Sequence, residues 1–320
     1  MENLLDPVIL FFVLGLVAGV SGSDLRLPES LYETLSIYLL ASIGLKGGVE
    51  LANGDPGGIL LPLLASIGLG ILIPPVAFAV LRASKRFGRA DAAAIAAHYG
   101  SVSVVTFAVA MTFLDRLEVP YEEYVTTLLV IMEIPGIAVG VIIARLGNGA
   151  GKGGLALGRL AHEVFFGKSI LLLVGGMAVG YLVGPDRLGG VEILFFDLFR
   201  GALAFFLLEM GIVTARRLAD LRSAGFFLVA FGIAMPLFSG ALGILAGALV
   251  GLSVGGTTIL ATLAASASYI AATAAMRVAV PEANPTLYLT ASLGVTFPFN
   301  IVVGIPLYYQ MALWILGTGG

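Results

Sequence analysis

The sequence predicts an all-α polytopic membrane protein with ten transmembrane helices in two inverted five-helix repeats. Three observations support this fold class. The 320 residues are 59% apolar and 12% charged, whereas soluble domains average about 45–50% apolar and about 25% charged residues. Ten apolar runs have a length that suits a helix across a bilayer. Short patterns from the first half of the chain also recur in the second half, in the same order.

Each apolar run of roughly 20 residues is predicted to be a helix, because a chain inside the bilayer must bond its own backbone polar groups. The first and sixth runs are short, so we expect these helices to stand upright or to lie among neighbours. No basic residue precedes the first run, which indicates a retained helix and not a signal peptide. The ten predicted spans cover residues 8–22, 30–46, 58–82, 91–114, 122–145, 168–184, 192–214, 224–250, 256–277 and 286–316.

The distribution of the seventeen Lys and Arg residues predicts the orientation, because cytoplasmic loops are enriched in positive charge. Thirteen of the seventeen lie in loops on one side of the predicted topology, and four lie on the other side. We therefore expect a multi-pass protein of the inner cell membrane with both termini outside, on the periplasmic face. The glycine-rich stretch 146–167 is then a cytoplasmic linker between a first five-helix repeat, 1–145, and a second, inverted repeat, 168–320.

The two halves share short patterns at matching positions. Ile9–Gly19 and Ile170–Gly180 align with their glycines at one offset, and Pro135 in the fifth span corresponds to Pro298 in the tenth. Because each repeat contains an odd number of spans, the second repeat must be inverted in the membrane. Inverted repeats are typical of secondary transporters, which bind their substrates near the bilayer midplane.

Two clusters of small polar residues interrupt apolar runs at matching positions of the halves. The fourth span contains Ser101, Ser103 and Thr106, and the ninth contains Ser266 and Ser268. Serine competes for backbone hydrogen bonds and therefore favours a break in a helix. Two interrupted helices that meet near the midplane would present free N–H groups and partial positive charge to an anion. We interpret these five residues as candidate substrate-binding groups; the alternative is that small residues only allow close helix packing.

Other polar residues in apolar surroundings are candidates for coupling transport to a cation. Glu133 lies among apolar residues of the fifth span, so its charge would be desolvated unless it is paired or bound to an ion. Tyr269, Thr273 and Asn300 are the further candidates, and carbonyl groups of unwound backbone could coordinate a sodium ion. The alternative for Glu133 and Asn300 is a structural hydrogen bond. His98 is a candidate proton relay or anion ligand, against the alternative of a hydrogen bond to a neighbouring helix.

The sequence argues against several other classes of function. Cysteine is absent, which excludes disulfides, thiolate metal sites and cysteine nucleophiles in this chain. A net charge of −3 provides no electrostatic surface for nucleic acid. His162 lacks the second histidine of a zinc-protease helix, and neither a nucleophilic serine elbow nor a phosphate-binding loop occurs. We therefore predict a protein that is not an enzyme and that uses no cofactor and no metal other than sodium.

Several motifs in both halves resemble those of the SbtA-type sodium-dependent bicarbonate transporter family. Arg277–Pro285 is similar to the family pattern Arg-x-Gly-Ile-Pro-x-Ala-Asn-Pro, and Ala264–Ser268 is similar to Ala-Ala-Ser-Ser-Ser. Met132–Pro135 stands where the family has Met-Asp-Ile-Pro. Ile43–Gly48 resembles Ile-Gly-Leu-Thr-Gly-Gly, and Gly304–Leu307 resembles Cys-Ile-Pro-Leu.

The resemblance implies a homotrimer in membrane lipid, in which a core carries bicarbonate and sodium past a scaffold. We expect spans 3–5 and 8–10 to form this moving core, and spans 1, 2, 6 and 7 to form the scaffold. It also implies that Ser103, Thr106, Ser266 and Ser268 form the bicarbonate site. The chain departs from the family at Tyr269, which replaces an aspartate, and it lacks the two prolines that follow. A PII-like regulatory protein is a further implied partner, although the long cytoplasmic insert of cyanobacterial members is absent from this chain.

The sequence therefore predicts a secondary active transporter that imports a small anion, with bicarbonate in symport with sodium as the first candidate. The alternative within transporters is a proton-coupled or differently selective member of the same fold that uses Glu133 and His98. An anion channel is the alternative from another class, and a membrane-embedded enzyme is the third.

Overall fold

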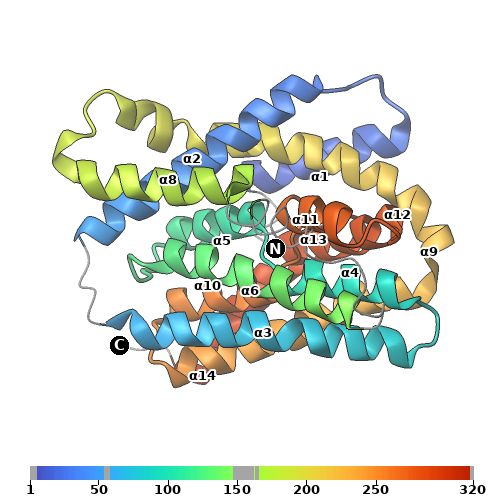
Figure 1. Ribbon diagram of the computed structural model, residues 1–320. Helices are drawn as coiled ribbons and strands as arrows, with labels where there is room; N and C mark the ends of the chain where they lie inside the picture. Colours follow the sequence, from blue (N-terminus) through green and yellow to red (C-terminus); the bar gives the residue numbers. More distant parts are fainter. Residues whose placement is uncertain (1–5, 54–57, 147–161, 163–165, 318–320) are drawn as a thin grey trace.

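The computed structural model describes residues 6–53, 58–146, 162 and 166–317 (Figure 1). These residues form helices joined by turns, without a strand among them, which confirms the predicted all-α class. Six helical segments are long and apolar enough to cross a membrane, and three shorter apolar helices accompany them. The six are Glu29–Asn53, Leu60–Ala83, Arg89–Arg116, Val125–Arg145, Gly225–Leu249 and Pro285–Leu316. The predicted linker 146–167 lies almost entirely outside the described residues.

The helices follow the predicted spans in order. They are α1 (Pro7–Ser21), α2 (Glu29–Asn53), α3 (Leu60–Ala83), α4 (Arg89–Gly100), α5 (Val104–Arg116), α6 (Val125–Arg145), α8 (Lys168–Val183), α9 (Phe199–Leu249), α10 (Val254–Ala265), α11 (Ala271–Ala279), α12 (Pro285–Leu289), α13 (Phe297–Phe299) and α14 (Ile305–Leu316). Two π-helical turns, Thr290–Thr296 and Asn300–Gly304, join the last three into one segment. A 3-10 turn (Pro185–Arg187) and a π turn (Ile193–Asp197) precede α9.

One predicted boundary is wrong. The spans 192–214 and 224–250 imply a loop between them, but α9 continues through residues 215–224. This stretch contains neither Gly nor Pro and consists mainly of good helix formers. The helical backbone is interrupted at Gly225, whose φ of 80° favours glycine. We therefore treat α9 as a first part, Phe199–Ala224, and a second part, Gly225–Leu249.

The helices pack as two groups, which Figure 1 shows one above the other. The α1–α2 group consists of α1, α2, α8 and the first part of α9, and the broken-helix group consists of the remaining helices. In the α1–α2 group, α1 crosses α9 and α2 crosses α8. A Cβ atom at Gly15 would clash with the carbonyl oxygen of Leu208, and one at Gly48 would clash with that of Met177. Glycine therefore allows the backbones to touch at both crossings.

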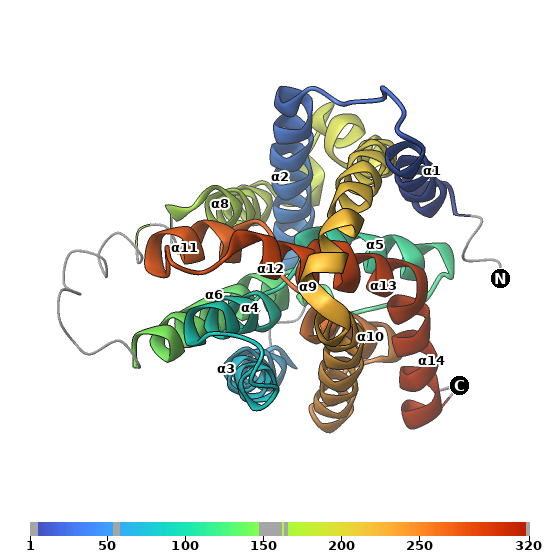
Figure 2. The same cartoon turned by 90° about the vertical axis from the view of Figure 1, so that its right-hand side faces the viewer.

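The broken-helix group is built around its most buried element. The apolar stretch of Arg89–Arg116, which contains α4 and α5, is buried throughout. α3 and α6 pack on α4, while α14 and the second part of α9 pack on α10. Figure 2 shows α5 and α11 between the α1–α2 group and the helices α3, α10 and α14. The interruptions between α4 and α5 and between α10 and α11 therefore lie inside the protein.

Candidate functional site

Two helices are interrupted where the sequence predicts breaks. Three residues separate α4 from α5, and five separate α10 from α11. Ser101, Ser103 and Ser266 have extended backbones. The breaks contact each other, because the Ser268 N–H donates to the carbonyl oxygen of His98 (2.8 Å) and the Ser103 N–H donates to Oγ of Ser266 (2.9 Å). Each broken helix thus accepts a hydrogen bond from a backbone N–H group in the break of the other helix.

Side chains bond further backbone groups at the breaks. Oγ of Ser103 accepts the N–H of Thr106 (3.2 Å) as the N-cap of α5. Oγ of Ser266 donates to a carbonyl in the last turn of α10 (2.9 Å). Nδ2 of Asn300 donates to the carbonyl oxygen of Ala265, the last residue of α10 (2.9 Å). These bonds stabilise the breaks, because unpaired backbone groups are costly to bury.

A small cavity lies between the N-terminal ends of α5 and α11. Its volume is about 10 Å³, which is close to the least that one water molecule requires. Five polar residues line it: Ser103, Glu133, Ser169, Ser268 and Tyr269. Its described lining contains no Lys, Arg or His. The cavity therefore combines hydroxyl groups and one carboxylate with two helix ends that carry partial positive charge.

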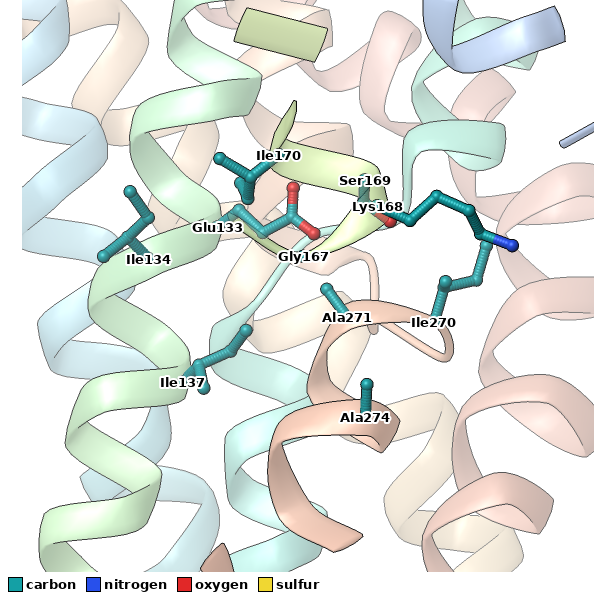
Figure 3. A pocket seen from close by; sticks show the side chains of 10 residues that line it. All are labelled: Glu133, Ile134, Ile137, Gly167, Lys168, Ser169, Ile170, Ile270, Ala271 and Ala274. Atoms are coloured by element: carbon teal, nitrogen blue, oxygen red, sulfur yellow. The ribbon is translucent and has the colours of Figure 1, made fainter. Parts of the chain in front are cut away.

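A larger cavity of about 190 Å³ adjoins the first, and the two share Glu133, Ser169, Ile270 and Ala271. Glu133 is 1% exposed, and its Oε2 atom has no hydrogen-bond partner among the described residues. Figure 3 shows the carboxylate of Glu133 reaching from α6 toward the first turn of α8. The side chain of Lys168 is exposed at the rim and leads away from it. Glu133 thus stands at the boundary of the two cavities.

The family model of the Na+-dependent bicarbonate transporter superfamily matches residues 7–313 of the chain. The chain belongs to this superfamily. The match extends over both broken helices and both cavities, and it confirms the resemblance seen in the sequence motifs. A comparison with curated proteins found no match. The superfamily is one of transporters, and the apolar helices of membrane-spanning length agree with that class.

In this member of the superfamily, two of the five predicted anion-binding residues face a cavity. Ser103 and Ser268 line the small cavity. Oγ of Ser266 and the backbone of Thr106 take part instead in the hydrogen bonds that hold the breaks. Ser101 is buried outside both cavities, and the described part of the chain offers no partner to its Oγ. Ser103 and Ser268 thus face a cavity and also accept a backbone N–H, whereas Ser266 bonds backbone groups without lining either cavity.

The predicted cation-coupling residues also divide into two pairs. Glu133 and Tyr269 line the small cavity. Oγ1 of Thr273 contacts Nε2 of His98 (3.1 Å) and lies 2.9 Å from the carbonyl oxygen of Tyr269. Asn300 uses both amide atoms, because its Oδ1 also accepts the hydroxyl of a tyrosine in α14 (3.0 Å). Thr273 and Asn300 therefore stabilise the surroundings of the breaks in this structure.

His98 links the two broken helices. Its ring is fully buried and stacks on Tyr288 with a centroid distance of 4.4 Å. Nδ1 lies 2.7 Å from the carbonyl oxygen of Ala94. Since a carbonyl can only accept, Nδ1 donates to Ala94, and Nε2 lies within hydrogen-bond distance of Oγ1 of Thr273, whose own proton goes to the carbonyl of Tyr269. This geometry supports the alternative of a hydrogen bond between neighbouring helices.

Ser169 and the beginning of α8 are functional candidates that the sequence interpretation missed. Ser169 is 5% exposed and lines both cavities. α8 begins after Gly167, which provides no side-chain cap for the first N–H groups. An uncapped helix start is a signal visible in the sequence. The sequence near Gly167 does not show that this helix end lies beside the breaks, because its position depends on packing between segments that are distant in the sequence.

Proposed function

We propose that the chain is a secondary active transporter that imports bicarbonate in symport with sodium. One observation carries this proposal for a member of this superfamily. The N-terminal ends of α5 and α11 face a common cavity lined by hydroxyl groups and a carboxylate. Each helix end contributes about +0.5 elementary charge, so an anion can bind there without Lys or Arg. The carboxylate of Glu133 supplies negative charge for a cation beside the anion.

The lining residues have chemistries that suit these two ions. The hydroxyls of Ser103 and Ser268 donate hydrogen bonds to bicarbonate oxygens. Glu133 and Tyr269 offer oxygen atoms, which are the ligands that hard cations such as sodium prefer. The small cavity holds about one water molecule, so bicarbonate requires it to widen toward the larger cavity.

We propose that the helices form ten spans in two inverted repeats, as the sequence predicts. The packing supports this architecture. In an inverted repeat, spans 1 and 2 correspond to spans 6 and 7. The crossing of α1 with the first part of α9 then corresponds to the crossing of α8 with α2, and both crossings are glycine contacts. The α1–α2 group would be the scaffold and the broken-helix group the moving core, with both termini outside the inner membrane.

The proposal extends to assembly in the membrane. Large apolar side chains of the scaffold are exposed, and they include Leu14 and Val17 of α1 and Leu171 and Leu182 of α8. Lipid or neighbouring subunits would cover such a surface. We propose a homotrimer, as the family resemblance implies. Regulation by a PII-like protein stays a prediction from that resemblance.

Uptake of labelled bicarbonate into proteoliposomes tests the proposal. An inward sodium gradient should drive accumulation above equilibrium at alkaline pH, where little carbon dioxide is present to cross the lipid. Replacement of sodium by potassium should abolish this accumulation. Accumulation that follows a proton gradient without sodium would support proton coupling instead, and flux that never exceeds equilibrium would support a channel. Absence of bicarbonate flux under every gradient would overturn the assignment of the anion.

A further inference from the structure

Three helix N-termini, and not two, border the connected cavities. The first turn of α8, Lys168–Ile170, lines the larger cavity, and Ser169 lines both. Its N-cap residue Gly167 makes no side-chain hydrogen bond to the first N–H groups. α8 belongs to the α1–α2 group, whereas α5 and α11 belong to the broken-helix group. The cavities therefore lie where both groups direct a helix N-terminus at the same space.

The charges around this space are nearly balanced by Glu133. Three helix ends together provide about +1.5 elementary charges, and an ionised Glu133 removes one of them. Its Oε2 atom is buried in the cavities without a partner among the described residues. In the described part of the chain, the ion pairs of Lys46, Arg116 and Arg200 are formed with acids other than Glu133, and Lys168 is exposed at the rim of the larger cavity with its side chain leading away. An ionised Glu133 is therefore the one side-chain charge in the described lining of the small cavity.

An anion at Ser103 and Ser268 would lie in the same small cavity as the carboxylate of Glu133. Two like charges at such short range repel strongly where the effective dielectric constant is low. That repulsion exceeds the gain from a hydrogen bond to a charged group. A cation on Glu133 removes the repulsion and leaves the partial positive charge of all three helix ends available to the anion.

We propose that Glu133 is a charge switch that makes the coupling cation bind before the anion, and that Ser169 in the first turn of α8 is an additional anion contact. This inference rests on the proposed function and adds an order of binding to it. An anion held by α5, α8 and α11 contacts both helix groups at once. The anion can therefore contact α8 and the broken-helix group together only after the cation has bound to Glu133.

Binding measurements on the purified full chain test the order directly. Labelled bicarbonate is titrated in sodium chloride and in choline chloride, and sodium is titrated without bicarbonate. We expect sodium to bind to the anion-free protein and bicarbonate to bind at least about tenfold more weakly in choline. Equal bicarbonate affinity in both salts would overturn the proposal. Wild type that binds no bicarbonate even with sodium would overturn the proposed function as well.

Glu133→Gln separates the charge of this residue from its shape. The variant should bind bicarbonate with the same affinity in sodium and in choline, because no charge remains to be neutralised. Glu209→Gln is the matched control, since Glu209 is 8% exposed and its Oε2 also has no partner in the described chain. This control should keep the sodium dependence of wild type. Persistent sodium dependence in Glu133→Gln would overturn the charge switch and leave the proposed function intact.

Ser169→Ala tests the contribution of α8. We expect it to weaken bicarbonate binding about fivefold or more while the dependence on sodium stays unchanged. Ser239→Ala is the control, because Ser239 is 1% exposed, lies in the second part of α9 and lines neither cavity. Wild-type affinity in Ser169→Ala would overturn the role of Ser169 as an anion contact.

Discussion

Hydroxyl groups at the two breaks differ in their tasks: Ser266 holds the backbone alone, whereas Ser103 and Ser268 hold the backbone and also face the small cavity. Ser266 accepts a backbone N–H from the other break and donates within its own helix, so it holds the crossing together. Ser103 and Ser268 each bond a backbone N–H of the following helix and also line the small cavity. Their loss therefore affects both the backbone and the ligand.

We expect Ser103→Ala and Ser268→Ala each to weaken bicarbonate binding by about 1–2 kcal/mol, the scale of a hydrogen bond to a charged group. Ser103→Ala should also lower the free energy of unfolding by about 1 kcal/mol, because it removes the N-cap of α5. Titration calorimetry measures the first effect and thermal unfolding measures the second. Unchanged affinity in both variants would show that the hydroxyls serve packing alone.

Gly136 of α6 makes a backbone contact that the site requires. A Cβ atom at this position would overlap the carbonyl group of Gly100, the last residue of α4. We expect Gly136→Ala to lower the free energy of unfolding by about 1–3 kcal/mol, because α6 must move away from the break. Gly68→Ala in α3, where an added Cβ would meet no atom of another helix within 4 Å, is the control. Chemical denaturation of both variants checks this; equal stability would contradict the predicted clash.

At the scale of elements, α5 joins the two groups of helices through ion pairs at its C-terminal end. Asp115 pairs with Lys46 of α2 (3.7 Å), and Arg116 pairs with Asp6 at the start of α1 (3.3 Å). Arg200 of α9 pairs with the same Asp6 carboxylate (3.4 Å). Asp6 is 5% exposed and also caps α1. Two adjacent residues of α5 are therefore bound to the α1–α2 group, at the end of α5 remote from the breaks.

Tyr121 in the loop after α5 reinforces this end. Its hydroxyl donates to Oδ1 of Asp115 (2.8 Å). Burial, followed by the negative charge of Asp115, raises the pKa of Tyr121. The hydroxyl therefore stays protonated, and the contact persists at the alkaline pH of the uptake experiment.

Asp6→Asn tests the contribution of the ion pairs. Asparagine caps a helix as well as aspartate does, so the substitution removes mainly the charge that faces Arg116 and Arg200. We expect the free energy of unfolding to fall by about 1–2 kcal/mol at low ionic strength. The difference from wild type should shrink in high salt, which screens the wild-type pairs. Thermal unfolding at two salt concentrations measures this difference, and Asp24→Asn at an exposed position is the control. A difference in stability that is the same at both salt concentrations would contradict an electrostatic role.

The breaks could be predicted from sequence because their signal is local. Ser-x-Ser in an apolar run offers the backbone alternative hydrogen bonds wherever it occurs. The place of Ser169 beside Glu133 could not be predicted, since it depends on how α8 packs against helices far away in sequence. For the same reason the sequence could not predict that Ser101, Thr273 and Asn300 lie outside the linings of the two cavities. The sequence shows that these residues are polar, whereas tertiary contacts decide which way their side chains point.

The whole molecule offers a test of topology that needs no ligand. The chain contains no cysteine, so a single introduced cysteine reports one position. We expect Gly151→Cys in the predicted linker to react with a membrane-impermeant reagent only from the cytoplasmic side. Gly317→Cys, after the last helix, should react only from outside, because five predicted spans separate the two positions. Labelling of both from the same side would contradict the inverted repeat.

The bend in α9 has a mechanical consequence for the whole molecule. One arm of α9 packs in the α1–α2 group, the other packs in the broken-helix group, and the two meet at Gly225. The second arm has 25 residues, which at about 1.5 Å per residue makes a lever of roughly 37 Å. A rotation of about 10° at the joint would carry the far end of this lever roughly 6 Å. A small change in the backbone torsion angles of Gly225 would thus displace the far end of α9 by about the pitch of one helical turn.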